Sequence, residues 1–245
     1  MIKEKALSPG EPELIIAQHV FPDMEAGKVG FRSGQYMASS DEIYITVKGK
    51  GGHAALPDRL IDPVLITAHL ITSLQQIVSR HAKPGVPTVL SFGKVEAAGA
   101  VNVIPDTVQI EGTFRTMNEE WRKKAHELIR KISTELSSSM GGSADVEIRH
   151  GYPVLYNDPK ITDRAKEFAV DFLGEEQVFD LDYRMTAEDF AYFAQEYPAT
   201  LFRLGTSVPG SMSSALHTST FNIDEKAIEL SIGLLAFMGI RFLTL

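Results

Sequence analysis

The clearest hydrophobic periodicity in the sequence lies between residues 41 and 151. Ile43, Ile45 and Val47 are each separated by one more polar residue, a pattern typical of a strand with one buried face. Similar patterns predict further strands at residues 89–95, 108–114 and 146–148. This part of the chain is therefore expected to contain a sheet.

Two amphipathic helices are predicted between these strands. Asp62 and Pro63 supply an N-cap and a proline at the first helical position. The apolar stripe of this helix is expected to consist of Val64, Ala68, Ile71, Leu74 and Val78. Asn118 precedes a second helix, expected over residues 119–139. The order of strand, helix, strand, strand, helix, strand is that of the split βαβ, ferredoxin-like arrangement.

The remainder of the chain has a different pattern. Residues 14–17 are an apolar run that predicts a strand buried on both faces, ending at Gln18 and His19. Later elements are expected at 161–173 (helix), 178–181 (strand), 188–196 (helix) and 200–204 (strand), followed by a loop over 205–214 and a last helix capped at Ile223 and Asp224. Alternating helices and strands predict a three-layer α/β domain.

We therefore predict one domain inserted into another. Residues 1–40 and 152–245 would form the outer α/β domain, and residues 41–151 the ferredoxin-like insert. The outer domain has few strands, so its sheet is expected to be small and exposed at one edge. Either a truncated chain or a covering partner would explain such an edge.

Composition excludes several classes of protein. Of the 245 residues, 44% are hydrophobic and 23% are charged, as in ordinary soluble domains. Lys and Arg number 24 against 32 Asp and Glu, which gives a net charge of −8 and argues against binding to nucleic acid or a membrane surface. The absence of cysteine excludes disulfides, thiolate metal sites and cysteine nucleophiles. With no apolar segment long enough to span a bilayer and no signal peptide, we expect a cytoplasmic protein.

Seven histidines are candidates for chemistry, and four of them receive a structural or surface interpretation. These four are His69, His81, His126 and His150. His19 is expected at the carboxyl end of a buried strand, where α/β sheets bind ligands, and His217 directly precedes the last helix cap. Because neutral imidazole is a common ligand of zinc-like metals, His19 and His217 are candidate metal ligands.

Other polar residues have weaker signals. His53 lies in a glycine-rich turn, which by itself is more often a hairpin than a site. Asn102 lies beside a turn and Arg115 at a strand end, and together they could hold a substrate carboxylate if both face a cleft. Glu188 and Asp189 are expected to open a helix, where acidic residues are favoured without any further role.

Eight short motifs occur in a fixed order along the chain, and together they are a far more specific signal than any one of them alone. They include QHVFPD at 18–23, GKGGHAALP at 49–57, DPV at 62–64 with LQQIVSR at 74–80, NVIPD at 102–106, GTFRT at 112–116, GYP at 151–153, AEDF at 187–190 and LHT at 216–218. The chain thereby resembles the M20 metallopeptidase superfamily, in the amidohydrolase branch that includes N-acyl-amino-acid, hippurate and indole-acetyl-amino-acid hydrolases.

This resemblance implies a partial zinc-peptidase-like α/β catalytic domain with an inserted ferredoxin-like dimerisation (lid) domain. It places His19 and His217 at ligand positions of a site for two divalent ions, zinc or manganese. His53 matches a lid histidine that polarises the scissile carbonyl in the partner subunit's cleft, and Asn102 and Arg115 match residues that hold the substrate carboxylate. Glu188 and Asp189 match a motif that supports the ligands from behind.

The implied substrate is an N-acyl amino acid or a short peptide, and the implied assembly is a homodimer formed through residues 41–151. Family members also carry a segment with further metal ligands and a glutamate base, ahead of the region that matches Met1. We therefore expect this chain to resemble the last two-thirds of such an enzyme and to be inactive or impaired alone. The alternatives are a non-catalytic dimerising module, or a site completed by another chain.

Overall fold

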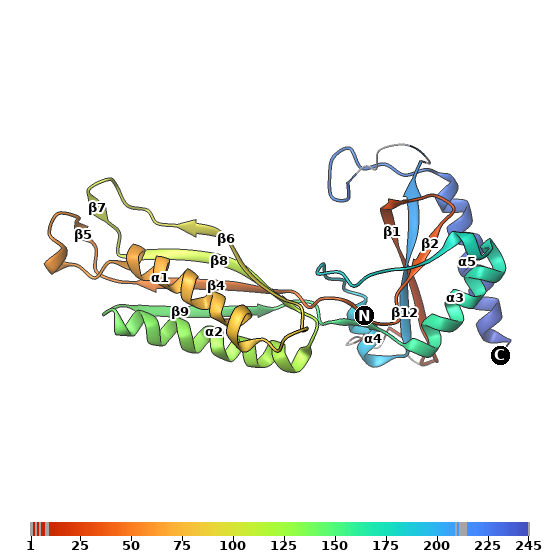
Figure 1. The fold of residues 1–245 in the computed structure, drawn as a ribbon, viewed down its shortest axis with the longest axis horizontal. Helices are drawn as coiled ribbons and strands as arrows, with labels where there is room; N and C mark the ends of the chain where they lie inside the picture. Colours follow the sequence, from red (N-terminus) through yellow and green to blue (C-terminus); the bar gives the residue numbers. More distant parts are fainter. Residues whose placement is uncertain are drawn as a thin grey trace. The chain divides into compact units, whose positions relative to one another are not determined.

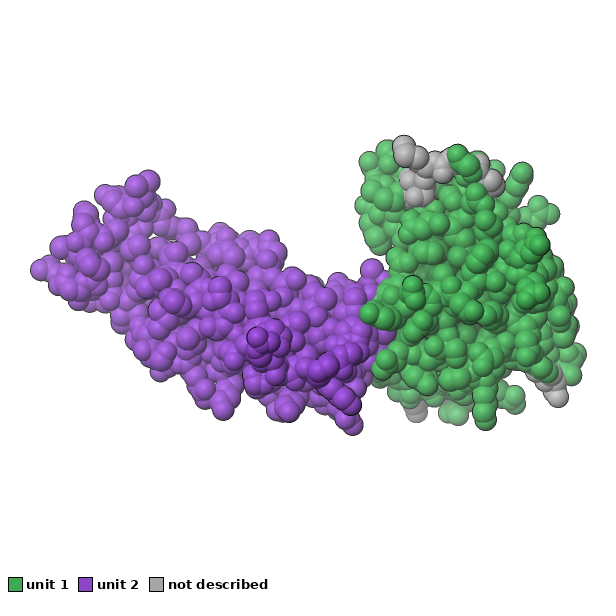
Figure 2. All heavy atoms as spheres, in the orientation of Figure 1, with its two compact units in different colours: residues 1–36, 155–184, 189–245 green, residues 37–154, 185–188 purple. Residues whose placement is uncertain are grey.

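The chain folds as two compact units that each combine helices and strands. The computed structural model describes residues 2, 4, 6–7, 10–208, 210 and 215–244. Unit 1 comprises residues 1–36, 155–184 and 189–245, and unit 2 comprises residues 37–154 and 185–188 (Figures 1 and 2). The fold is therefore mixed α/β. None of the helices in the described part of the chain has the length and apolar character needed to cross a membrane.

Unit 2 is built on a four-stranded antiparallel sheet in the order β6-β8-β4-β9. Its strands are β4 (Asp41–Lys48), β6 (Thr88–Glu96), β8 (Thr107–Thr116) and β9 (Ser143–His150). Helices α1 (Pro63–Gln76) and α2 (Glu119–Ser139) pack against one face of this sheet, and a π-helical turn (Ile77–His81) follows α1 (Figure 1). The chain order and the strand order together are those of the split βαβ arrangement.

The sequence patterns explain why unit 2 has these elements. Ile43, Ile45 and Val47 are buried under the helices, as their alternation predicts. The Asp62 side chain accepts hydrogen bonds from two backbone amides at the start of α1. The Asn118 side chain accepts one from the backbone amide of Trp121 at 2.8 Å, so α2 begins as predicted.

The predicted apolar stripe of α1 is wrong by part of a turn. Val64 is 40% exposed and Ala68 is exposed, and of the predicted residues only Leu74 is fully buried. The buried face instead consists of Pro63, Ile66, Thr67, Leu70 and Leu74. Both stripes have helical spacing. The buried one contains Thr67, whose hydroxyl is satisfied by donating to the Pro63 carbonyl oxygen at 2.7 Å.

A second, two-stranded sheet in unit 2 joins β5 (Gly52–His53) to β7 (Val103–Ile104). A 3-10 helix (Pro57–Arg59) follows β5. This small sheet brings together two sequence motifs that lie about 50 residues apart in the printed sequence.

Unit 1 contains a four-stranded mixed sheet in the order β1-β12-β2-β11. Its strands are β1 (Ile15–Glu25), β2 (Val29–Phe31), β11 (Val178–Asp180) and β12 (Ala199–Ser207), and its helices are α3 (Pro159–Leu173), α4 (Ala191–Glu196) and α5 (Lys226–Leu243). A 3-10 helix (Glu175–Gln177) precedes β11, and β10 (Leu155–Asn157) pairs with β3 (Gly34–Met37). The sheet is small, and β1 lies at its edge with residues 15–21 only half-buried.

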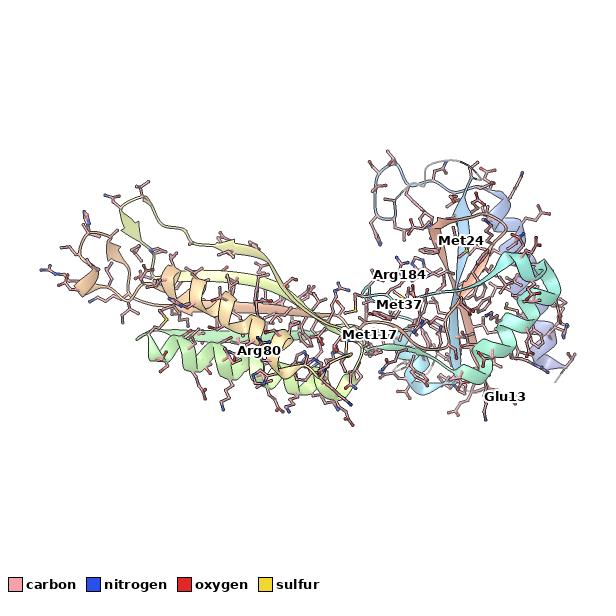
Figure 3. All side chains as sticks on the ribbon, in the orientation of Figure 1. Glu13, Met24, Met37, Arg80, Met117 and Arg184 are labelled. Atoms are coloured by element: carbon pink, nitrogen blue, oxygen red, sulfur yellow. The ribbon has the colours of Figure 1, made fainter. Side chains whose placement is uncertain are left out.

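The core of unit 1 lies between β2, β12, α3 and α5. The rings of Phe31 and Phe202 stack with centroids 5.1 Å apart, and Leu234 and Met238 of α5 are buried in the same cluster. Elsewhere in the unit, Arg184, labelled in Figure 3, lies over the ring of Phe21 at 4.8 Å. The N-cap residue of α5 is Glu225, one residue later than predicted, and the Asp224 side chain accepts a hydrogen bond from the backbone amide of Lys226 at 3.0 Å.

Three predicted boundaries in unit 1 are wrong. Strand β1 does not end at His19 but continues to Glu25. Pro22, which has no N–H to donate, is tolerated inside the strand because β1 is an edge strand and its pairing with β12 is irregular at this point. Helix α4 starts at Ala191, after a turn in which the Asp189 carbonyl oxygen accepts from the Tyr192 amide at 3.0 Å. Strand β12 extends to Ser207, into the predicted loop, and residues 209 and 211–214 of that loop lie outside the described residues.

Candidate functional site

His19 lies within β1 of unit 1, opposite Arg203 of β12, and not beyond the end of a strand as predicted. Its Nδ1 is 2.8 Å from the carbonyl oxygen of Val20. An imidazole that donates through Nδ1 to a backbone carbonyl carries its lone pair on Nε2, and this arrangement is common among metal-ligating histidines. The local geometry of His19 is therefore compatible with metal binding through Nε2.

His217 lies in a turn of unit 1, before α5. Its φ angle is +61°, and among the described residues no other residue except glycine has a positive φ. The side chain is exposed, and the neighbouring Thr218 hydroxyl donates to the Ala215 carbonyl oxygen at 2.8 Å. Left-handed backbone at a residue other than glycine is uncommon and occurs disproportionately at functional sites. This feature distinguishes His217 from an ordinary loop histidine.

The described residues do not complete a metal site. No group of three or more His, Asp and Glu side chains among them is placed to hold a metal ion. A structural or catalytic zinc ion needs at least three protein ligands. His19 and His217 therefore do not suffice for a metal centre within the described part of the chain, and we derive no chemical step through one.

His53 lies in β5, and Asn102 directly precedes β7, the partner of β5 in the two-stranded sheet of unit 2. His53 pairs with Val103, and the next amide, that of Ala54, donates to the carbonyl oxygen of Asn102 at 3.0 Å. His53 Nδ1 accepts a hydrogen bond from the Ala55 amide at 3.1 Å. The proton of the neutral ring is then on Nε2, so this exposed side chain presents an N–H donor.

Gly51 and Asp106 hold the two strands of this β5–β7 sheet together. The Gly51 amide donates to Asp106 Oδ1 at 2.8 Å, and the Gly49 amide donates to the Asp106 carbonyl oxygen at 2.9 Å. A Cβ atom on Gly51 would collide with the backbone of Ile104 and Pro105. Glycine is required here for close approach of two backbones, which explains the glycine-rich turn beside His53.

Arg115 lies near the end of β8 in unit 2 and is half-buried. Its Nη1 donates to the carbonyl oxygen of Met185 at 3.2 Å. Within the described part of the chain it makes no ion pair, and it lines a hollow on the outer face of the sheet. A guanidinium with this environment can accept a carboxylate bidentately.

Glu188 and Asp189 do not open a helix. Both lie in the segment before α4, Glu188 in unit 2 and Asp189 in unit 1. The structure therefore removes the helix-terminus explanation for these two acidic residues and brings neither into a metal-binding group within the described residues.

A buried charged cluster in unit 2 was missed by the sequence analysis. Asp41 is fully buried, and its carboxylate contacts the guanidinium of Arg122 and, at 2.8 Å, Nε2 of His126. Glu119 binds the same guanidinium at 3.1 Å. The alternation of β4 contained the signal, because Asp41 has the same parity as Ile43, Ile45 and Val47 and must therefore face inward.

Burial alone would raise the pKa of Asp41. The hydrogen bonds from Arg122 and His126 and their charges outweigh this effect and lower the pKa of Asp41 from 3.8 to about 2. Burial likewise opposes the charge of Arg122, but Asp41 and Glu119 raise its pKa above the ordinary value. Asp41 is therefore ionised at neutral pH and serves the packing of unit 2.

Comparison with known proteins places these residues in a family. The family model described as peptidase family M20/M25/M40 matches residues 1–238. An N-acetyldiaminopimelate deacetylase of Geobacillus sp. (strain WCH70) is 32% identical over 235 residues, covering 96% of this chain and 61% of that protein. An N-acetyl-L-cysteine deacetylase of Bacillus subtilis (strain 168) is 36% identical over 216 residues, covering 88% of this chain and 50% of that protein.

Solved structures are also similar to this chain over almost its whole length. A crystal structure from methicillin-resistant Staphylococcus aureus superposes with a TM-score of 0.87 at 28% identity, covering 98% of this chain and 61% of that one. The Bacillus subtilis YxeP protein, described as a dinuclear metal binding peptidase from the M20 family, gives 0.79 at 27% identity, covering 99% and 60%. The chain thus spans 50–61% of the length of these relatives. With its sequence matched over almost its full length, the chain belongs to peptidase family M20/M25/M40.

Proposed function

We propose that the chain is part of a metal-dependent amidohydrolase that cleaves the amide bond of N-acyl amino acids. Relatives at 32% and 36% identity are named as deacetylases of N-acetylated amino acids, which supports this substrate class. The structural observation that carries the proposal is the β5–β7 sheet of unit 2, which orients the ring of His53 and joins its segment to that of Asn102.

The geometry of His53 supports a role in stabilising negative charge. With Nδ1 accepting from Ala55, Nε2 donates, and such a donor stabilises the oxygen of a scissile carbonyl as it becomes an oxyanion. Arg115 would hold the carboxylate of the substrate bidentately. Asn102 lies at the opposite end of β8, about 25–30 Å from Arg115 within one chain, so it would reach the same substrate only from the partner's lid, together with His53. These three residues would act in substrate binding and polarisation, which need no metal ion of this chain's own.

The two units take different roles in this proposal. Residues 41–151 would be the inserted lid domain, through which two copies form a homodimer that places His53 in the partner's cleft. Residues 1–40 and 152–245 would be the catalytic-type α/β domain. There His19 and His217 would each supply one ligand to a site for two divalent ions, zinc or manganese, with Glu188 and Asp189 supporting the ligands. Ligands beyond the described residues would be needed to complete that site.

A non-catalytic dimerising module is the second candidate. The observation favouring it is that no three or more His, Asp and Glu side chains among the described residues are placed together to hold a metal ion. Such a module would remain dimeric after metal chelation and would show no metal-dependent hydrolysis.

Turnover by the purified chain tests the proposal. Acetate release from N-acetyl amino acids with added Mn²⁺ or Zn²⁺ should be slow and metal-dependent, and His53→Ala should lower it by about 10²- to 10³-fold. His69→Ala, which removes an exposed histidine of α1, should leave it unchanged. Turnover independent of His53 contradicts the assignment, and turnover in the ordinary enzyme range of about 1–10³ per second contradicts the incomplete site.

A further inference from the structure

The β5–β7 sheet of unit 2 is too short to be stable by its own pairing. It lies at one end of the unit, beyond the four-stranded sheet, and β5 consists of the two residues Gly52 and His53 (Figure 1). Isolated two-stranded sheets are marginal in water even when their strands are longer. The exposed ring of His53 therefore keeps one orientation only if other contacts hold β5 in place.

Asp106 provides two of these contacts on the side where the chain enters β5. Its Oδ1 accepts a hydrogen bond from the Gly51 amide at 2.8 Å, and its carbonyl oxygen accepts one from the Gly49 amide at 2.9 Å. Asp106 directly precedes Thr107, which begins β8 and pairs with Lys48 of β4. Asp106 thus ties the entry of β5 to the four-stranded sheet.

The entry segment is costly to order. Three of the residues 49–52 are glycine, and Gly52 has a φ angle of +150°, which favours glycine. Glycine loses more conformational freedom on folding than any other residue. On the other flank, Lys50 and Ile61 exchange backbone hydrogen bonds at 2.8 and 3.0 Å. Each hydrogen bond to this segment therefore matters more to its order than it would in a strand of β-branched residues.

The exit from β5 determines the orientation of the ring. The Ala54 amide donates to the Asn102 carbonyl oxygen at 3.0 Å, and the Leu56 amide donates to the His53 carbonyl oxygen at 2.9 Å. The second of these bonds closes a turn in which the Ala55 amide donates to His53 Nδ1 at 3.1 Å. The tautomer of His53 thus depends on a turn that stays in place only while β5 remains paired with β7.

We propose that Asp106 is a positioning residue for His53. By accepting from Gly51, its carboxylate holds β5 in the register that keeps His53 Nδ1 an acceptor and Nε2 a donor. It acts through the backbone and does not itself touch the substrate. Without this bond, β5 separates from β7, and the ring presents its Nε2–H group for only part of the time. The inference rests on the proposed function for the group that receives this donor, the carbonyl oxygen of the substrate.

The tautomer of His53 can be measured without turnover. Long-range ¹H–¹⁵N correlation spectra of the intact chain, recorded at a pH where the ring is neutral, distinguish a protonated ring nitrogen from an acceptor. We expect the wild type to show the Nε2–H form and Asp106→Ala to show a mixture of the two tautomers. Hydrogen exchange at the Ala55 amide should speed up by about tenfold in this variant, as for the loss of one hydrogen bond.

Two further variants separate positioning from general stability. Asp106→Asn retains an Oδ1 acceptor for Gly51 and should keep the wild-type tautomer. Asn118→Ala removes a comparable acceptor, that of the Trp121 amide at the start of α2. It should lower the stability of unit 2 but leave the ring signals of His53 unchanged. Circular dichroism spectra of all variants would establish that they are folded.

The inference is overturned if Asp106→Ala leaves the tautomer of His53 unchanged, if Asp106→Asn fails to restore it, or if Asn118→Ala alters it equally. A ring that responds as expected, in a chain whose acetate release does not depend on His53, would uphold the inference and count against the proposed function.

Discussion

The carboxylate of Asp41 in β4 accepts two hydrogen bonds from the guanidinium of Arg122 in α2, from Nε at 2.8 Å and from Nη2 at 2.5 Å. The same guanidinium donates to the carbonyl oxygen of Gly151 at 3.2 Å, and the Gly151 amide donates back to Asp41 at 3.2 Å. This cluster joins the start of β4, the first turn of α2 and the end of β9. A buried pair with this many hydrogen bonds holds three elements of unit 2 in one register.

Removing one partner of the Asp41–Arg122 pair should lower the stability of unit 2. Arg122→Ala leaves the Asp41 carboxylate buried without its main counter-charge, so the free energy of unfolding should fall by about 3–5 kcal/mol. Urea denaturation followed by circular dichroism measures this change. Lys131→Ala, which removes an exposed ion pair with Glu135 on the same helix, should cost less than about 1 kcal/mol. Equal effects of the two substitutions would show that the Asp41 cluster does not stabilise unit 2.

The depressed pKa of Asp41 predicts how stability varies with pH. Because its pKa in the folded chain is about 2 and its ordinary value is 3.8, the unfolded chain takes up the proton first as the pH falls. The stabilisation is therefore complete above about pH 4 and is lost toward about pH 2, with a total of about 2 kcal/mol.

Comparison with Asp41→Asn isolates this contribution. The difference in unfolding free energy between the wild type and the variant should shrink as the pH falls from about 4 to about 2. A difference that stays constant over this interval would contradict the depressed pKa.

Gly112 of β8 and Gly93 at the bulge of β6 predict a matched pair of stability changes. Gly112→Ala places a methyl group against the Ser91 carbonyl oxygen and the Phe92 ring and should destabilise by about 1–3 kcal/mol. Gly93→Ala has nothing within 4 Å of the added atom and should change stability by less than about 0.5 kcal/mol. Thermal or urea unfolding of both variants makes the comparison, and the reverse ranking would show that the bulge is placed differently.

Asp106 predicts a local effect on the β5–β7 sheet that carries His53. Asp106→Ala removes the acceptor of the Gly51 amide, so hydrogen exchange at that amide should speed up by about tenfold, as expected for loss of a hydrogen bond of about 1.4 kcal/mol. Core amides such as that of Ile45 should keep their protection. Unchanged exchange at Gly51 would mean that this hydrogen bond does not order the β5–β7 sheet.

Local signals in the sequence were sufficient for much of unit 2. Helix α2 and its Asn118 cap follow from side-chain chemistry within a few residues, and the alternation around Ile45 fixes the buried face of β4. The remaining features of the fold depend on contacts between residues far apart in the sequence. The buried face of α1 depends on the sheet beneath it, and the continuation of β1 past Pro22 depends on pairing with β12, about 180 residues later.

The candidate site residues likewise combine features that the local sequence predicts with features that depend on distant residues. The glycines beside His53 indicated a turn, but the tie between Gly51 and Asp106 depends on a partner 55 residues away. The acidic pair Glu188 and Asp189 is typical of a helix N-terminus, but the local turn at Asp189 delays the start of α4 until Ala191. His217 has no local signal for its positive φ angle, which only the folded backbone reveals.

Titration of Zn²⁺ into the purified chain by calorimetry tests most directly whether this chain supplies only part of a metal site. We expect binding weaker than about 10 µM that is lost in His19→Ala and His217→Ala and kept in His69→Ala. Tight, stoichiometric uptake of one or two ions by the chain alone would contradict this expectation.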